Sequence, residues 1–169
     1  MPTDIPSLTP ALIWHELPSA TRLAMAEAFW ADEDSVPQQA EAVQAIASQL
    51  RFRPQSVLKL APEKLARHLA SMHRVSENLA GRLLVVYHLA SQRPMLEAFL
   101  DALGIAHENG VIAESSSHTP DPETLQAAAD RLRTQFAVAD VRLYLRTLAA
   151  QDPETWSGLL PIVSVWPAA

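Results

Sequence analysis

The chain has 169 residues, a hydrophobic fraction of 49% and a formal net charge of −6. It contains no cysteine, which excludes disulfides and thiolate chemistry. Its first residues lack the basic and apolar regions of a signal peptide, and no apolar run is long enough for a transmembrane helix. We therefore expect one cytoplasmic domain that spans residues 1–169 and makes no membrane contact.

The composition favours helices over sheets. Alanine and leucine dominate the apolar residues, while aromatic residues are few and only four glycines occur. Prolines mark where helices begin, because the first helical position has no use for an amide hydrogen. Eight of the thirteen prolines precede an apolar helical pattern: Pro10, Pro18, Pro37, Pro54, Pro62, Pro94, Pro122 and Pro153. The sequence predicts an all-α fold, a single irregular bundle of about seven to nine helices.

In chain order, the helical spacing of apolar residues predicts a series of short helices. They cover residues 9–17, 19–31, 37–50, 52–60, 62–72, 76–91, 94–103, 122–136, 140–150 and 153–160. In the helix after Pro54 we expect Val57, Leu58 and Leu60 to face inward. Asp121 and Asp152 precede two of the prolines, so we expect them to cap their helices.

We expect residues 76–91 to form the buried central helix of the bundle. Ser76 is a natural N-cap, and Glu77 places a carboxylate near the positive end of the helix dipole. Leu79, Leu83 and Val86 lie at helical spacing, with a second apolar stripe beside them. A helix that is apolar around most of its circumference is usually enclosed by neighbours.

Three non-helical segments follow the central helix. Gly104 is expected to end the helix before it, and Asn109-Gly110 between short apolar pieces predicts a tiny β-hairpin over 105–112. Three consecutive serines predict a flexible loop at 115–120. Residues 161–169 are expected to form an extended tail.

The charge is distributed in three blocks. Residues 1–50 carry one basic and seven acidic residues, residues 51–93 carry eight basic and two acidic, and residues 94–169 carry four basic and ten acidic. Such asymmetry can mark a binding face. Most charge runs are instead compensated within the fold, so we expect the acidic flanks to cover the basic segment and to prevent binding to a polyanion.

The basic segment also contains a pattern typical of a helix-turn-helix. Two short helices meet at a tight break within residues 54–72, and one face of the second carries Lys64, Arg67, His68 and Ser71. Further cations lie nearby in the sequence: Arg51, Arg53 and Arg74. These residues are our candidates for binding an anion or a partner, and DNA is one alternative. The turn contains no glycine, and the net acidity disfavours DNA.

A ligand or enzyme site near Tyr87, His88 and His107 is a further alternative, because histidine can act as an acid or a base. No nucleophile motif accompanies these residues, and the histidines are not at metal-ligand spacing. We therefore expect no cofactor, no metal and, on balance, no enzyme activity. Trp156 and Trp166 are candidate interface residues. The favoured function is a non-enzymatic interaction or regulatory domain that binds a protein partner or a second copy of itself.

Overall fold

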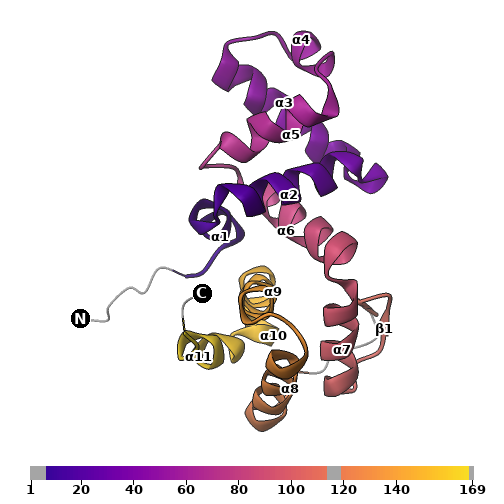
Figure 1. Ribbon diagram of the computed structural model, residues 1–169, viewed down its shortest axis with the longest axis vertical. Coiled ribbons are helices and arrows are strands. Elements are labelled where there is room, and N and C mark those ends of the chain that lie inside the picture. Colours follow the sequence, from indigo (N-terminus) through magenta and orange to yellow (C-terminus); the bar gives the residue numbers. More distant parts are fainter. Residues whose placement is uncertain (1–6, 114–118, 168–169) are drawn as a thin grey trace, which may run out of the picture. The chain divides into compact units, whose positions relative to one another are not determined.

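The computed structural model describes residues 7–113 and 119–167, and within these ranges the protein is all-α with one small β-hairpin (Figure 1). The predicted fold class is confirmed. The described ranges contain eleven α-helices, more than expected from the sequence. The predicted flexible loop 115–120 lies mostly outside the described residues, which include only its last two positions.

The chain divides into two compact units, residues 10–90 and residues 91–169 together with residues 1–9. We call them the N-terminal unit and the C-terminal unit. That the whole chain acts as one domain stays a prediction. The N-terminal unit contains α1 (Pro10–Glu16), α2 (Ser19–Ala31), the 3-10 turn η1 (Glu33–Ser35), α3 (Val36–Leu50), α4 (Pro54–Leu58), α5 (Pro62–Ser71) and α6 (Glu77–Ser91).

Proline positions predicted the helix starts well. Each of the eight prolines lies at the first or second residue of a helix or, for Pro18, at the residue just before α2. The two predicted aspartate caps are also present. Asp121 Oδ1 accepts from the Thr124 amide at 2.9 Å, and Asp152 Oδ1 accepts from the Thr155 amide at 3.3 Å.

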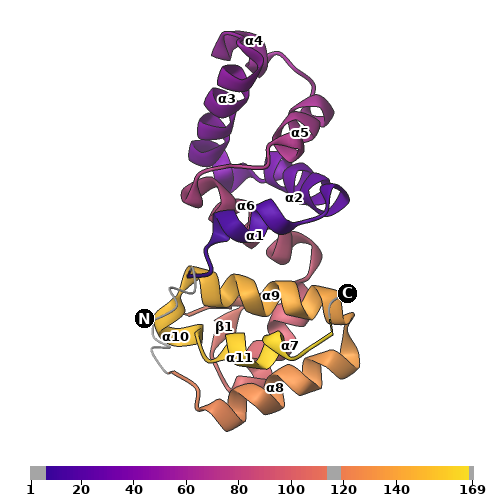
Figure 2. The same cartoon turned by 90° about the vertical axis from the view of Figure 1, so that its left-hand side faces the viewer.

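The core of the N-terminal unit forms where α2 packs along α5 (Figure 2). The inward face of α5 consists of Leu65, Ala66, Leu69 and Ala70, all buried. Its two alanines allow the helices to approach closely, and burying the leucines contributes roughly 2 kcal/mol each. The opposite face of α5 is therefore the one left for solvent.

Side-chain hydrogen bonds connect α6 to the helices around it. The amide of Ala11, in the first turn of α1, donates to Glu77 at 2.9 Å. Glu41 of α3 accepts from Ser76 and, at 2.8 Å, from Asn78. Ser76 also accepts from the Leu79 amide at 3.1 Å, which confirms the predicted cap.

The C-terminal unit contains α7 (Arg93–Leu103), β1 (His107–Glu108), β2 (Val111–Ile112), α8 (Pro122–Gln135), α9 (Val138–Gln151), α10 (Pro153–Trp156) and α11 (Leu159–Ser164). Its aromatic core is centred on Phe99, which lies edge to face with Tyr144 at 5.7 Å and beside Trp156 at 6.0 Å. The strands are antiparallel, and the turn between them uses positive φ angles at Asn109 and Gly110, as the hairpin prediction requires.

The prediction of an extended tail at 161–169 is wrong for residues 161–164, because α11 covers Leu159–Ser164; residues 168–169 lie outside the described residues. Leu159, Ile162, Val163 and Trp166 are buried, and they follow helical spacing. Pro161 lies in the first turn, where its missing amide hydrogen costs nothing. The β-branched Ile162 and Val163 favour extended backbone, but burial against α8 and α9 outweighs that weak preference.

Substitution of Leu83 tests the importance of α6. Leu83 is fully buried. Leu83→Asp would bury an unpaired charge, so we expect a loss of several kcal/mol and of cooperative unfolding, followed by circular dichroism on heating. Leu89→Asp, at a half-buried position of the same helix, should cost less. A cooperative Leu83→Asp protein with unchanged stability would show that α6 does not organise its unit.

Candidate interaction surface

The outer face of α5 carries the polar residues predicted for it. Lys64, Arg67 and Ser71 are exposed, and His68 is half-buried beside them. Arg67 Nε donates to the Glu63 carbonyl at 3.3 Å, a local contact that leaves the guanidinium at the surface. The predicted amphipathic second helix is therefore present, although the helix before it, α4, has only five residues.

A second group of cations surrounds the C-terminus of α3. Arg51 ends this helix in the left-handed region, with φ 56° and ψ 36°. The Phe52 amide donates to the Ala47 carbonyl at 2.9 Å, which completes a Schellman-type C-cap. Glycine normally occupies this position, and a residue with a side chain costs about 1 kcal/mol there. Local backbone energetics therefore do not explain the arginine.

Exposed apolar side chains accompany these cations. Phe52 is 54% exposed and Leu58 is 65% exposed. The prediction that Leu58 faces inward is wrong, because α4 is little more than one turn long and buries only Val57. We call the group Arg51, Phe52, Arg53, Leu58 and Lys59 the basic end of α3.

Within the N-terminal unit, the acidic residues of 7–50 do not cover the five predicted anion-binding cations; that residues 94–169 cover them stays a prediction. Arg51, Arg53, Lys64, Arg67 and Arg74 are all exposed, and none forms an ion pair within residues 7–113 and 119–167. Of the cations in 51–93, only Arg82 reaches an acidic partner in those ranges.

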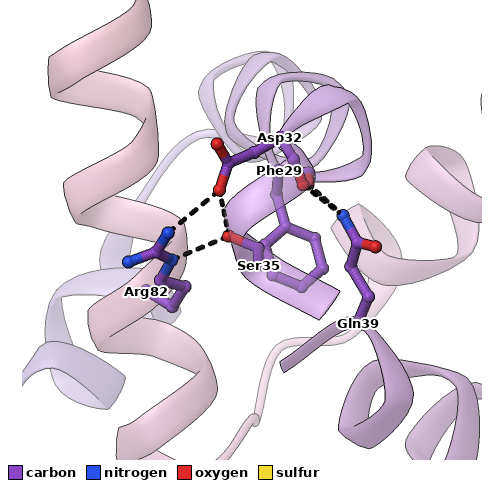
Figure 3. Close-up of polar contacts among 5 residues, drawn as sticks. All are labelled: Phe29, Asp32, Ser35, Gln39 and Arg82. Carbon is purple, nitrogen blue, oxygen red and sulfur yellow. Dashed lines mark hydrogen bonds and ion pairs between the residues drawn. The ribbon is translucent and has the colours of Figure 1, made fainter. Parts of the chain in front are cut away.

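Arg82 of α6 fixes the corner between α2 and α3 (Figure 3). It contacts Asp32 Oδ2 at 3.0 Å and Ser35 Oγ at 2.7 Å, and Ser35 also donates to Asp32. Gln39 Nε2 donates to the carbonyls of Phe29 and Asp32 at 2.8 and 2.9 Å. Partial burial raises the pKa of Asp32, but hydrogen bonds from Ser35 and Arg82 and the Arg82 charge outweigh it and lower the pKa.

The same corner leaves three neighbouring side chains outside. Glu33 and Asp34 are exposed, and Val36 is 61% exposed. Neither carboxylate has a partner among the described side chains. We call Glu33, Asp34 and Val36 the acidic end of α3.

His88 belongs to the core of α6. It is 2% exposed, and its Nδ1 lies 2.8 Å from the Leu84 carbonyl oxygen, so Nδ1 carries the proton. Burial lowers the pKa of His88 to about 4, with the Leu84 hydrogen bond opposing the shift. Tyr87 is half-buried and lies edge to face with it at 5.4 Å. A neutral, enclosed imidazole is poorly suited to proton transfer near pH 7.

His107 lies in the C-terminal unit, where it connects the hairpin to α7. Its Nε2 lies 2.8 Å from Asp101 Oδ1, and its Nδ1 accepts from the Gly110 amide at 3.2 Å. Both ring nitrogens of His107 therefore form hydrogen bonds within the fold, and neither is available to contact a substrate. A shallow hollow of about 350 Å³ between α7 and α8 does not include His107.

The two candidate interface tryptophans are part of the C-terminal unit's interior. Trp156 is 3% exposed and Trp166 is 5% exposed. Arg133 lies over the Trp166 ring, 4.7 Å from its centre, and Trp156 packs beside Phe99. Their burial accounts for both residues without a partner.

Sequence reasoning missed a buried cation at the start of α2. Arg22 is 5% exposed; its Nη1 lies 3.0 Å from His73 Nδ1, and its guanidinium lies 6.0 Å from the centre of the Trp14 ring. Its Nε is buried without a hydrogen-bond partner in the described structure. The only signal in the sequence was that Arg22 is the single basic residue among the first fifty.

The described residues, 7–113 and 119–167, offer neither a metal site nor a membrane span. No group of three or more histidine, aspartate or glutamate side chains there could hold a metal ion. None of the helices in that part of the chain is long and apolar enough to cross a membrane.

Asp32→Asn should destabilise the protein by about 1–2 kcal/mol at pH 7, because it removes the charge that Arg82 contacts. Since the folded-state pKa of Asp32 is lowered, the ionised carboxylate stabilises the fold above its unfolded pKa of about 3.9. That stability is lost as the pH falls through the folded-state pKa. Urea unfolding from pH 7 to pH 3 should show the two proteins converging. Asp34→Asn is the matched control and should change little; a constant gap at every pH would contradict the pairing.

His88 should remain neutral when the protein is titrated by NMR from pH 8 to pH 5. Its folded-state pKa, about 4, lies below the ordinary histidine pKa of 6.5, so the neutral ring stabilises the fold above pH 6.5. This contribution is lost as the pH falls from 6.5 towards 4. His88→Gln identifies the signal and should flatten the pH dependence of stability in that interval. A His88 titration midpoint near the ordinary histidine pKa of 6.5 would refute the enclosed, neutral state.

Of the residues predicted to bind an anion or a partner, Arg51, Arg53, Lys64, Arg67 and Arg74 are thus exposed, and the exposed Phe52 and Leu58, which were not predicted, lie near them in the sequence. The chain matches no protein-family model, no curated protein and no solved structure.

Proposed function

We propose that the protein is a non-enzymatic interaction protein that uses the basic end of α3 and the outer face of α5 to bind an acidic segment of a protein partner. The observation that carries the proposal is the exposure of Arg51, Arg53, Lys64 and Arg67, none of which has an acidic partner among the described residues. We further propose that it acts in the cytoplasm.

The apolar side chains favour a protein partner over a simple polyanion. Phe52 and Leu58 lie within eight residues of each other and are each more than half exposed. An aromatic ring beside arginines is a common anchor at protein interfaces, and an exposed leucine gains from contact with another apolar side chain. An acidic segment that also carries apolar residues satisfies both kinds of contact.

Nucleic acid is the second candidate, because Lys64, Arg67, His68 and Ser71 share the outward face of α5. Such a face suits contact with phosphates. The net charge of −6 opposes long-range attraction to DNA, and the helix before α5 is only five residues long. We therefore rank it below the protein partner.

The wild-type protein should be retained on heparin at about 50 mM salt and released steeply as salt rises, because several charges act together. Lys64→Glu/Arg67→Glu should abolish retention. Arg93→Glu/Arg131→Glu lies at exposed sites outside the proposed surface and changes the net charge by the same amount. This variant should be retained more strongly on heparin than Lys64→Glu/Arg67→Glu. Arg51→Gly should weaken retention while raising stability by about 1 kcal/mol, because glycine suits the positive φ. An unretained wild-type protein, or equal loss in both double variants, would refute the surface.

The partner class is tested with labelled probes in fluorescence anisotropy. A glutamate-rich peptide carrying leucines should bind more tightly than the same peptide with serine in place of leucine, and more tightly than a short DNA duplex. Phe52→Ser/Leu58→Ser should remove the difference between the two peptides. Tighter binding of the duplex would promote the nucleic-acid candidate instead.

A further inference from the structure

We infer that the acidic segment recognised by the basic end is the acidic end of α3 in a second copy of this chain, so that copies associate head to tail. This inference rests on the proposed function and names its partner. The two surfaces lie at opposite ends of one 15-residue helix, roughly 22 Å apart (Figure 2).

The distribution of exposed apolar residues points to these two ends. Five large apolar side chains stand out as exposed in the described structure: Val36, Phe52, Leu58, Val111 and Val165. Val36 begins α3, Phe52 follows its C-terminal end and Leu58 ends the next helix, α4; each lies near exposed charged residues in the sequence. Single exposed apolar residues need no explanation, but clusters rimmed by charge mark association sites.

The two ends are complementary in charge as well as apolar in part. The acidic end offers Glu33 and Asp34 next to Val36, and the basic end offers Arg51, Arg53 and Lys59 next to Phe52 and Leu58. Opposite potentials steer two surfaces together and fix their orientation.

The helix dipole accounts for part of this pattern. Acids near the first turn of α3 and cations near its last turn stabilise the helix alone. That effect does not require the exposed Phe52, Leu58 and Val36, and it does not explain why Arg51 occupies a position where glycine is favoured. Docking of a second copy accounts for all of these features together.

The contact joins two different surfaces, so it does not close on itself as a symmetric dimer does. When one copy binds through its basic end, the basic end of the copy that it contacts remains free to bind a further copy. The expected product is a series of oligomers whose mean size grows with protein concentration. The contact is small and partly ionic, so salt should weaken it.

The test disables one end at a time. Arg51→Gly/Arg53→Ser removes two cations from the basic end, with glycine suited to the local backbone. Glu33→Gln/Asp34→Asn removes the acidic charges at positions that the Arg82 corner does not use. Glu108→Gln/Glu154→Gln, at exposed sites of the C-terminal unit, is the charge-matched control. Circular dichroism melting confirms that each variant is folded.

Sedimentation is measured across protein concentrations at low salt. The wild type and the control should form oligomers beyond the dimer, and each end variant alone should associate at least about tenfold more weakly. An equimolar mixture of the two end variants should restore a dimer and stop there, because only one intact pair of ends remains. A monomeric wild type, or a mixture no larger than its components, would overturn the inference, as would an end variant that dimerises alone.

The peptide assay separates this inference from the proposed function. If the wild type remains monomeric but binds the leucine-containing acidic peptide, the head-to-tail contact is refuted and the proposal of an acidic partner is kept. If the wild type neither associates nor binds the peptide, both the head-to-tail contact and the proposed function are refuted.

Discussion

The contact on which the N-terminal unit depends is that of Arg82 with Asp32 and Ser35. It connects α6 to the turn between α2 and α3, and so sets the direction in which α3 leaves α2. Gln39 adds a second hydrogen bond to each of the carbonyls of Phe29 and Asp32 at the end of α2, which secures the first turns of α3 to the same corner. Because both side chains of the ion pair are partly buried, water screens it less than a surface pair. Asp32 pairs with Arg82 in this corner, whereas the carboxylates of Glu33 and Asp34 remain exposed to solvent.

A second polar contact in this unit, formed by Arg22, involves no carboxylate. The Arg22 guanidinium lies against the ring of Trp14 and close to His73 Nδ1, and it connects α2 with α1 and with the segment before α6. Burying an unpaired cation is costly, and the aromatic face and the imidazole nitrogen offset part of that cost. The Trp14 indole also donates to the Met72 carbonyl at 2.7 Å, which secures the same segment. The unit is thus held together by a few specific polar contacts as well as by the apolar α2–α5 interface.

Most of the fold could be predicted because its signals are local. Proline positions, aspartate caps and the Asn109-Gly110 turn act within a few residues, and each was found where the sequence placed it. Errors arose where tertiary contacts decide. A one-turn helix does not reveal which side it buries, so Leu58 was misplaced. The exposure of the basic segment depends on which acids come within reach in space, and among the described residues Asp32 does so, for Arg82. Arg22 gave no sequence signal of burial, since its environment is assembled from three separate elements.

The backbone supplies an internal comparison that bears on the basic end. Positive φ angles occur at four described positions, and at three of them the chain uses residues suited to that conformation: Gly104, Asn109 and Gly110. Only Arg51 departs from this rule. A sequence that is otherwise consistent with its local structure departs from it chiefly where function demands a particular side chain. At Arg51 the departure coincides with exposed Phe52 and Leu58, which also add nothing to the core. Backbone strain, exposed apolar area and unpaired charge thus occur together within one short segment, and a bound partner would cover the apolar area and pair the charge, which would offset the cost of the strain.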